Sequence, residues 1–500
     1  MPRFVRAWAL VAYVVLAACG GGGAGDGALP GAADGRDGVR VAVTEDIWPL
    51  TGQGPASKAF AAGDLSVGVY EPLLRLGTDF TVQPGLAERW EMVGDQTWRF
   101  HLRRGVSFHD GRPFTADDVV WSWTGRQFLS AAVTGVLDRI DKLDDHTVDF
   151  VLNSPNLRLP EQLVHPEGPI VPNGSHNDST PPAGTGPFKV VDYRPRQRVV
   201  VERHDGYWGE KARLEQVTFV FMPDPAERVE ALLAGEVDVA ANVPWASVAA
   251  IEASGRATVA RAPAGATQVL SFTTAGALPD REVRQAVALA VDRSAYITAV
   301  LGGNGEPARS LSPPAVLGTA ASQLAVVGFD PAAARRTLDD AGWRAGPDGV
   351  RAKDGRRLTL ALVAGPALPE EGLRAIQGQL REVGIEVATR HGADITTHQE
   401  FRQRGYDLEL AMPNQNDANP FFLLAGRAAG GHADVARTAD SRQGVQQVAV
   451  AATHTQVVDE LLVVPLAHVP RLYGLRPGMH LADLHPSAIN QSWAALTASR

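Results

Sequence analysis

The sequence predicts a mixed α/β protein built from two or three lobes. Its 500 residues exceed the roughly 250–300 residues at which a single hydrophobic core stops growing, so the chain is expected to divide. Hydrophobic residues make up 45% of the chain and charged residues 21%, a balance typical of folded soluble proteins. Segments that alternate apolar and polar residues are interleaved with segments of helical periodicity, and this interleaving indicates an α/β fold.

Four segments carry the strand pattern. The apolar run from Val39 to Val43 predicts the first strand and the beginning of the globular part. Three later segments place apolar residues at every second position, as half-buried strands do. These are Trp98, Phe100 and Leu102, then Val148, Phe150 and Leu152, and finally Val217, Phe219 and Phe221.

Two helices are predicted from their termini. Asp224-Pro225 places a capping carboxylate before a first-turn proline, which is a favoured way to begin a helix. Gly235 then ends the apolar face that follows, as glycine commonly does at a helix C-terminus. Asp330-Pro331 repeats the same device.

Two further helices are predicted from the spacing of their apolar residues. The i, i+3, i+4, i+7 spacing that begins at Val283 predicts one continuous helix from about Asp280 to Ala299. The same periodicity predicts a helix over Leu373 to Val383, followed by a strand over Ile385 to Ala388. The stretch from His165 to Pro187 is rich in Pro, Gly and Asn, so we expect it to cross between lobes.

The N-terminal segment has the composition of a secretion signal followed by a tether. A positively charged start precedes an almost wholly apolar run, Ala7 to Ala18, which is shorter than the ~20 residues that a membrane-spanning helix needs. Leu16-Ala17-Ala18-Cys19-Gly20 resembles a bacterial lipobox, which implies cleavage before Cys19 and lipid attachment to its thiol. We therefore expect a signal peptide at 1–18 and a lipidated Gly-rich tether at 19–38. An uncleaved anchor is the alternative.

Composition and motifs argue against several classes of function. The formal net charge of −9 disfavours nucleic-acid binding, which needs a basic surface. Cys19 is the only cysteine, so neither an intramolecular disulfide nor a clustered-thiolate metal site can form. No nucleophile elbow, zinc-protease helix, Walker loop or calcium-loop spacing occurs in the chain. We therefore expect no cofactor and no nucleic-acid partner.

A few residues have the right chemistry for a site but an equally simple structural explanation. His109-Asp110 resembles the start of a catalytic pair, yet the Gly and Pro that follow predict a turn. Tyr207-Trp208, Trp121 and Trp123 are candidates for a ligand platform and for the hydrophobic core alike.

Several motifs follow one another from about residue 39 to the end of the chain. The longest extends from Leu86 to Val119 and contains Phe108-His109-Asp110-Gly111-Arg112-Pro113-Phe114. The shorter ones are Gly184-Thr185-Gly186-Pro187-Phe188, Tyr207-Trp208-Gly209, Pro223-Asp224-Pro225, Gly235-Glu236-Val237-Asp238-Val239, Val283-Arg284-Gln285-Ala286 and Ala341-Gly342-Trp343. In this order they resemble the family 5 solute-binding proteins of bacterial ABC importers, which include dipeptide, oligopeptide and nickel receptors.

The resemblance implies a periplasmic-binding-protein-like fold of type II. Two α/β lobes would be joined by a hinge, with an extra subdomain on the first lobe and the solute enclosed by hinge closure. The expected limits are 39–75, 175–262 and 465–500 for lobe I, 76–174 for the extra subdomain and 263–464 for lobe II. A non-enzymatic, monomeric receptor is implied, lipid-anchored outside the cell membrane, or in the periplasmic space of a two-membrane cell. It would deliver a small solute to ABC permease subunits.

The resemblance also places a candidate ligand loop. In peptide-binding members, an aspartate four residues before the Pro of this loop pairs with the α-amino group of the ligand, through a charge-assisted hydrogen bond. Asn416 holds that position here, and the nearest carboxylate is shifted by one residue to Asp417. The residues that the resemblance brings to an enclosed peptide are Asn414, Asn416, Asp417 and Asn419 in the loop, with Tyr70, Arg126 and Trp245 elsewhere in the cleft.

Nickel-type members supply the main alternative. Their metal-contacting histidine stands in a Ser-His-Ala-Asp context, and this chain has Gly431-His432-Ala433-Asp434 at the matching place. Arg126 lies near one of the arginines that clamp the chelator, whereas Glu167 stands at the other. An extracytoplasmic hydrolase is the alternative of another class, but no motif nominates the nucleophile and base that it requires. The ordered motifs also disfavour a structural adhesin.

Overall fold

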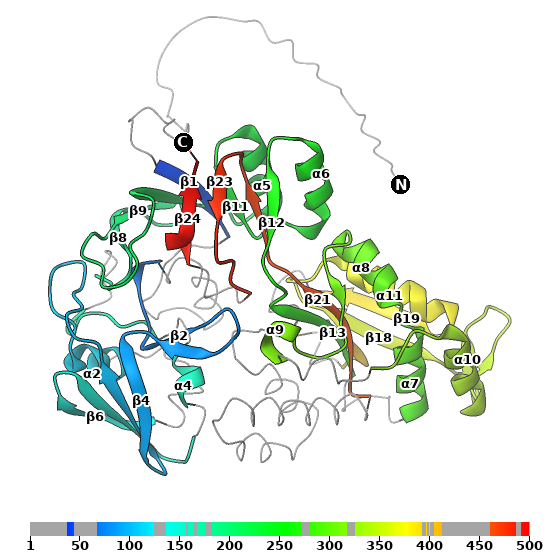
Figure 1. Cartoon of the computed structure of the whole chain (residues 1–500). Coiled ribbons are helices and arrows are strands. Elements are labelled where there is room, and N and C mark those ends of the chain that lie inside the picture. The colour runs from blue at the N-terminus through cyan, green and yellow to red at the C-terminus, as the bar shows by residue number, and fades with distance from the viewer. Residues whose placement is uncertain are drawn as a thin grey trace, which may run out of the picture. The chain divides into compact units, whose positions relative to one another are not determined.

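The structure is a computed structural model of the chain, drawn in Figure 1. The residues that it describes are 38–44, 68–124, 137–156, 159–164, 168–175, 183–272, 280–317, 326–392, 397, 400, 405–412, 461–486 and 492–499.

A seven-stranded sheet contains the first strand of the globular part. Its strands, in spatial order, are β12 (Thr258–Arg261), β22 (Leu472–Leu475), β11 (Val239–Ala241), β1 (Gly38–Val43), β10 (Gln216–Phe221), β9 (Arg198–Arg203) and β8 (Phe188–Arg194). β1 pairs in parallel with both β10 and β11, and the outer pairs are antiparallel. Helices α5 (Pro225–Ala234) and α6 (Val248–Ala253) contribute Leu232 and Ile251 to the core beside this sheet.

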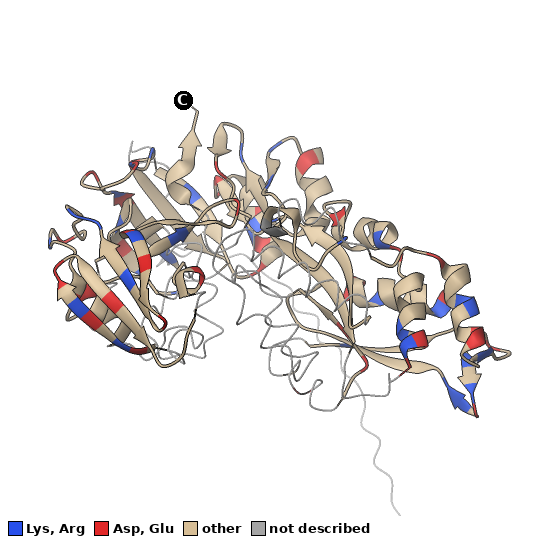
Figure 2. Ribbon diagram, turned by 60° about the horizontal axis from the view of Figure 1, so that its bottom comes forward, with Lys and Arg blue, Asp and Glu red and all other residues tan. Residues whose placement is uncertain are grey.

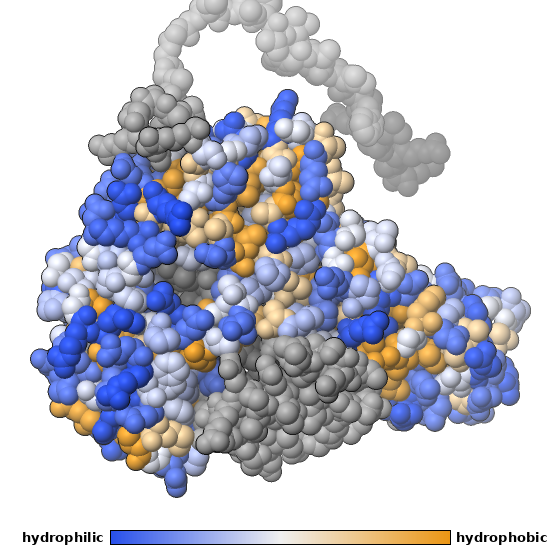
Figure 3. Space-filling view, in the orientation of Figure 1, coloured by the Kyte–Doolittle hydropathy of each residue, from blue (hydrophilic) through white to orange (hydrophobic). Residues whose placement is uncertain are grey.

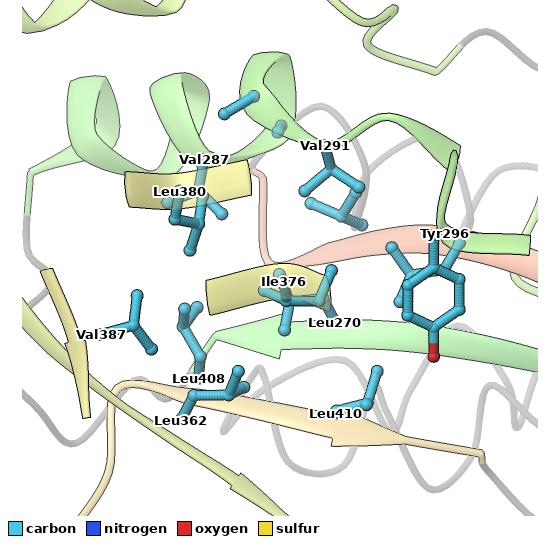
Figure 4. Packing of buried hydrophobic residues seen from close by; sticks show 14 of the residues in the cluster. Leu270, Val287, Val291, Tyr296, Leu362, Ile376, Leu380, Val387, Leu408 and Leu410 are labelled. Atoms are coloured by element: carbon cyan, nitrogen blue, oxygen red, sulfur yellow. The ribbon is translucent and has the colours of Figure 1, made fainter. Parts of the chain in front are cut away.

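A six-stranded sheet forms the second α/β unit. Its strands, in spatial order, are β14 (Glu306–Pro307), β21 (Val463–Val469), β13 (Ala266–Phe272), β20 (Leu408–Ala411), β18 (Thr359–Ala364) and β19 (Glu386–His391). Its helices are α7 (Arg281–Ala290), α8 (Arg293–Leu301), α9 (Pro314–Leu317), α10 (Pro331–Asp340) and α11 (Glu370–Glu382). Leu270, Leu408 and Leu410 on the strands and Val287 and Ile376 on the helices belong to one buried hydrophobic cluster (Figure 4).

A four-stranded antiparallel sheet makes a third unit with its own core. It consists of β4 (Ala87–Gly94), β5 (Thr97–Leu102), β7 (Thr147–Leu152) and β6 (Leu137–Asp144), with helices α2 (Ala116–Thr124) and α4 (Leu159–Gln162) in the same part of the chain. Its strands contain both basic and acidic residues (Figure 2). Arg99 forms two hydrogen bonds of 2.8 Å with the Asp149 carboxylate across neighbouring strands.

Three small antiparallel sheets complete the topology. They are β2 (Leu74–Leu76) with β3 (Val82–Pro84), β15 (Arg344–Ala345) with β16 (Arg351–Lys353) and β17 (Arg356–Arg357), and β23 (Met479–Leu481) with β24 (Leu496–Ala498). Two short 3₁₀ helices are η2 (Trp245–Ser247) and η5 (Trp493–Ala495).

Two short connections join the seven-stranded and six-stranded sheets. β12 leads into β13 through residues 262–265, and β21 leads into β22 through residues 470–471. The two connections are hydrogen-bonded to each other, since the Ala262 amide donates to the Arg471 carbonyl at 2.9 Å. Gly265 passes so close to Pro486 that an added Cβ would lie 1.7 Å from the Pro486 carbonyl oxygen. Only glycine fits at that point.

The strands and helices predicted from local signals are present. The three alternating segments form β5, β7 and β10, and the first apolar run forms β1. The Asp224 carboxylate accepts hydrogen bonds from the Ala226 and Glu227 amides, and Gly235 ends α5 in the left-handed conformation with φ 81°. The Asp330 carboxylate accepts from the Ala333 amide at the start of α10. The segment from 373 lies in α11 and the strand after it is β19.

The single helix predicted from Asp280 to Ala299 is wrong, because the structure has two. Val291 is extended, with φ −87° and ψ 109°, and separates α7 from α8. The Asp292 carboxylate accepts a hydrogen bond from the Ala295 amide and therefore begins a new helix. The apolar spacing continues across this break because both helices pack on the same sheet.

The described surface offers no membrane-spanning element. No helix within the described ranges is both long and apolar enough to cross a bilayer. The visible face in Figure 3 is largely hydrophilic, with smaller hydrophobic areas between. Large hydrophobic residues exposed within the described ranges are Met92, Val93, Leu143, Val191 and Phe329.

Candidate functional site

Three parallel strands of the seven-stranded sheet end at one edge. β1 follows neither of its neighbours directly in sequence and lies between β10 and β11, so the strand order reverses at β1. In open α/β sheets, ligands bind beyond the carboxyl ends of the strands at such a reversal. The residues just after Val43, Phe221 and Ala241 therefore form the first candidate edge.

Hydrogen bonds hold this edge together. The Met222 amide donates to the Val43 carbonyl at 2.9 Å, which ties the end of β10 to the end of β1. Asn242, directly after β11, has φ 55° and its Nδ2 donates to Thr44 Oγ1 at 2.9 Å. A non-glycine residue in the left-handed region is uncommon and Asn tolerates it better than most. The edge is thus built from strand ends fixed to one another.

The six-stranded sheet has a matching reversal. β18 pairs in parallel with β19 on one side and with β20 on the other. Its carboxyl edge consequently lies beyond Ala364 and Ala411. The loop that the sequence predicts to contact a ligand, Asn414 to Pro420, begins three residues after Ala411.

Both edges lie next to the two connections between the sheets. Ala241 at the end of β11 pairs with Tyr473, and the Val243 amide donates to the Leu472 carbonyl at 3.1 Å, immediately after the 470–471 connection. Ala411 at the end of β20 pairs with Val269, three residues into the strand that follows the 262–265 connection. The topology therefore places the carboxyl edges of both sheets, where α/β proteins bind ligands, next to the same two connections.

Trp245, a predicted cleft residue, lies at these crossovers. It begins η2 after β11 and packs against the core of the six-stranded unit as well as the core beside α5 and α6. Its indole N–H donates to the Pro470 carbonyl at 3.4 Å. The structure thus shows Trp245 contacting both α/β units at the connection.

Tyr70, the second described cleft candidate, is buried, with 2% of its surface exposed. It lines a cavity of about 670 Å³ together with Glu71, Arg75 and Tyr207. The charged residues around this cavity have both signs: Lys211 and Arg75 are basic and Asp483 is acidic. The lining alone therefore does not select an anionic or a cationic solute.

Glu71 accepts hydrogen bonds from three side chains that are distant in sequence. Tyr207 Oη lies 2.8 Å from Oε1, and Trp208 Nε1 and Thr185 Oγ1 each lie 2.9 Å from Oε2. Burial raises the pKa of Glu71, while the Trp208 hydrogen bond, the Arg75 charge and the other two hydrogen bonds act in the opposite direction. This set, named here the Glu71 cluster, holds the half-buried Tyr207-Trp208 pair in place through hydrogen bonds to Glu71.

The remaining aromatic candidates pack against other protein groups. The Trp208 ring lies beneath two guanidinium groups, 4.2 Å from Arg103 and 5.1 Å from Arg75. Trp123 is buried and meets Phe150 edge to face, with ring centroids 5.8 Å apart. Trp121 packs at the margin of the core of the seven-stranded sheet. These contacts favour the core interpretation over a ligand platform.

His109 is in the predicted turn and also anchors a distant loop. Gly111 has φ 88°, and its amide donates to the Phe108 carbonyl. The His109 ring accepts a hydrogen bond from the Gly184 amide at Nδ1, 3.1 Å, and donates from Nε2 to the Gly186 carbonyl, 3.0 Å. Both bonds require the neutral ring with its proton on Nε2. Burial lowers the pKa of His109 to about 4.

Several predicted site residues lie outside the described residues. They are Cys19, Arg126, Glu167, Asn414, Asn416, Asp417, Asn419 and His432. Within the described ranges, no group of three or more His, Cys, Asp or Glu side chains is arranged to hold a metal ion.

Sequence reasoning missed Glu71, Asn242 and Arg228. Glu71 and Asn242 bond residues more than 100 positions away in the chain, whereas the partners of Arg228 are near in sequence but lie on two separate strand ends. Arg228 sits on α5 and reaches the ends of β10 and β11. The only local signal for Arg228 was its position after the Asp224-Pro225 cap, on the buried side of a predicted helix.

Comparison with known proteins places these features in a family. The model of bacterial extracellular solute-binding proteins, family 5 Middle, matches residues 81–432. The nickel-binding periplasmic protein of Escherichia coli K12 is 27% identical over 462 residues, 82% of this chain and 85% of that protein. The dipeptide-binding protein of the same organism is 30% identical over 317 residues, 56% of this chain and 59% of that protein.

A solved structure agrees with these matches over nearly the full length. The structure of NikA from Brucella suis in complex with Fe(III)-EDTA has a TM-score of 0.78 and 25% identity, and the match covers 92% of this chain and 99% of that chain. The mixed α/β architecture and the two-lobe fold of type II are thereby confirmed.

Proposed function

Because the chain belongs to the bacterial extracellular solute-binding proteins of family 5, we propose that it captures a peptide outside the cell membrane and delivers it to the permease subunits of an ABC importer. The observation that carries this proposal is the pair of strand-end edges that meet at two crossovers. Two lobes joined at such crossovers can close over a solute, which removes water and completes its contacts. We therefore propose that the chain is a binding protein rather than an enzyme.

The proposed lobes follow the sheets. Lobe I contains the seven-stranded sheet, lobe II the six-stranded sheet, and the four-stranded sheet is the extra subdomain. β21 remains in the six-stranded sheet through Val469, so we place the return to lobe I at residues 470–471 instead of 465. The stretch 165–187 leads from the four-stranded sheet to β8, within the proposed lobe I and its subdomain.

A peptide solute is supported by the charge available beyond β20. The loop that follows this strand contains the carboxylate of Asp417, and an enclosed carboxylate binds a peptide ammonium group strongly. The E. coli relative at 30% identity is named a dipeptide-binding protein.

We expect Asp417→Asn to weaken dipeptide binding by about 1.5–3 kcal/mol, the usual size of a hydrogen bond to a charged group. Titration calorimetry with a dipeptide mixture, and mass spectrometry of the solute retained on purification, measure this directly. Asp354→Asn is the matched control, because it removes the same charge at a different place. Asp354 has φ 50°, a backbone conformation that Asn adopts readily. Equal affinities for the wild type and Asp417→Asn would remove Asp417 from the site.

A metal chelate is the second candidate solute, favoured by His432 and by the nickel-binding relative. A neutral imidazole is a good nickel ligand. His432→Ala would then abolish nickel-chelate binding while Asp417→Asn would do little. Binding would also decline as the pH falls through the ordinary histidine pKa near 6.5, because a protonated ring cannot ligate.

The membrane attachment is proposed to depend on Cys19. Cys19→Ala should leave the protein unprocessed or released, because the tether composition offers no other lipid attachment. Detergent-phase partitioning and intact-mass spectrometry of the mature chain measure the outcome. If the variant partitions into detergent exactly as the wild type does, the lipid anchor is not at Cys19.

A further inference from the structure

Arg228 is a buried cation that donates hydrogen bonds to backbone carbonyls. It is 3% exposed, and all its hydrogen-bond partners among the described residues are carbonyl oxygens. Nε donates to Ala241 at 3.1 Å, Nη2 to Asn242 at 3.1 Å, and Nη1 to Met222 at 2.6 Å and Pro223 at 3.0 Å. Burial lowers the pKa of this guanidinium, and the charges of Asp224 and Glu227 act in the opposite direction.

These four carbonyls belong to two strand ends that flank β1. Met222 and Pro223 follow β10, whereas Ala241 and Asn242 end and follow β11. β1 lies between them, and its end is bonded to both sides, through Met222 and through the Asn242–Thr44 hydrogen bond. The Arg228 guanidinium therefore joins the ends of β10 and β11 on either side of β1.

The chemistry of the contact is specific to arginine. Its planar guanidinium offers five N–H donors in a fixed geometry, which suits several carbonyls in different directions. The lysine ammonium is a compact point charge on a flexible stem, so it cannot reproduce the fork. At this edge the loops carry no other described side chain that bonds the ends of both β10 and β11.

We infer that Arg228 is a positioning residue for solute capture: it fixes the backbone at residues 222–223 and 241–242, so that the lobe I edge is preformed when a solute arrives. This inference rests on the proposed function, since it assigns a role to the edge at which the solute is bound. A preformed edge binds more tightly because less conformational entropy is lost on binding.

Arg293 provides a matched control in the other α/β unit. It is also buried, and it also donates to backbone carbonyls, Pro465 at 2.7 Å and Val327 at 2.9 Å. Burial lowers the pKa of Arg293 as well. Arg293→Lys therefore removes the same kind of interaction without touching the edge formed by β1, β10 and β11.

Hydrogen–deuterium exchange of the full mature chain tests the inference without a solute. In Arg228→Lys, amides in 241–247 and 222–224 should exchange about tenfold faster, while the six-stranded sheet is unchanged; local opening raises exchange locally. Arg293→Lys should accelerate exchange in α8 and β21 and leave 241–247 unchanged. Exchange that rises uniformly in Arg228→Lys, or equally at 241–247 in both variants, overturns the inference.

Asn242→Gly is the second variant, in case Arg228→Lys does not fold. Glycine accepts the positive φ at this position, so the bond to Thr44 is lost without backbone strain, and exchange at 241–247 should again rise. No rise in this variant would contradict a rigid edge.

Affinity separates the inference from the proposed function. With the dipeptide alanyl-phenylalanine as probe, Arg228→Lys should raise Kd about tenfold, about 1.4 kcal/mol, and Arg293→Lys should leave it unchanged. A local exchange effect together with a wild type that binds no peptide would refute peptide capture but support the preformed edge. An unchanged Kd in Arg228→Lys, with binding intact in the wild type, would overturn the positioning role.

Discussion

Replacing Glu71 by alanine is expected to lower the free energy of unfolding by about 3–5 kcal/mol, because each buried donor left without an acceptor costs about 1–3 kcal/mol. Three donors lose their acceptor together: Tyr207 Oη at 2.8 Å, Trp208 Nε1 at 2.9 Å and Thr185 Oγ1 at 2.9 Å. Glu71 is 4% exposed and Thr185 is fully buried, so an alanine at position 71 leaves the Thr185 hydroxyl without its protein acceptor. Urea denaturation followed by circular dichroism measures the change.

Glu210 supplies the control for this effect. It lies two residues after Trp208, and its side chain is 84% exposed beside Arg213. Glu210→Ala should therefore change the free energy of unfolding by less than about 0.5 kcal/mol. A loss below about 1 kcal/mol in Glu71→Ala would mean that the three donors find other partners. The Glu71 cluster would then contribute little to holding Thr185 and Tyr207-Trp208 to the segment of Glu71.

The elements that sequence alone predicts correctly are those whose signals are local. Asp224 and Asp330 begin their helices through hydrogen bonds to amides two or three residues ahead, and such short-range geometry is written in neighbouring residues. Strand alternation in β5, β7 and β10 is equally local. Apolar periodicity does not predict the break between α7 and α8, because the apolar spacing continues on both sides of the capping residue Asp292.

The parts that sequence does not predict depend on contacts that only the folded chain creates between separate elements. Glu71 meets Thr185 and Trp208 across 114 and 137 residues, and neither pairing leaves a pattern in a single sequence. Arg228 resembles any charged helix residue until the fold brings the ends of β10 and β11 to it. The motif order did predict the family, because many short signals in a fixed order are specific even when each alone is weak.

Stability is expected to fall as the pH is lowered from about 6.5 to about 4, and His109 should account for about 3 kcal/mol of the loss. Burial lowers the pKa of His109 to about 4, and the neighbouring positive charges of His204 and Lys189 act in the same direction, opposed by the Gly186 hydrogen bond and Asp110. In the unfolded chain the ring has its ordinary pKa near 6.5. Between these values the unfolded state binds more protons than the folded state, so stability rises with pH.

The geometry gives the same sign independently. Protonation would place an N–H at Nδ1 against the Gly184 amide N–H, 3.1 Å away, so the loop 184–186 loses one of its two bonds to the ring. His109→Gln cannot titrate and should remove about 3 kcal/mol of the pH dependence between pH 6.5 and 4, as measured by urea denaturation at a series of pH values. His480→Gln, at the exposed middle position of β23, makes the same substitution without touching the Gly184 and Gly186 bonds and is the control. Parallel pH profiles for the wild type and His109→Gln would show that the pKa of His109 is the same in the folded and unfolded states. The bonds from the His109 ring to the 184–186 loop would then not be the acid-sensitive contact.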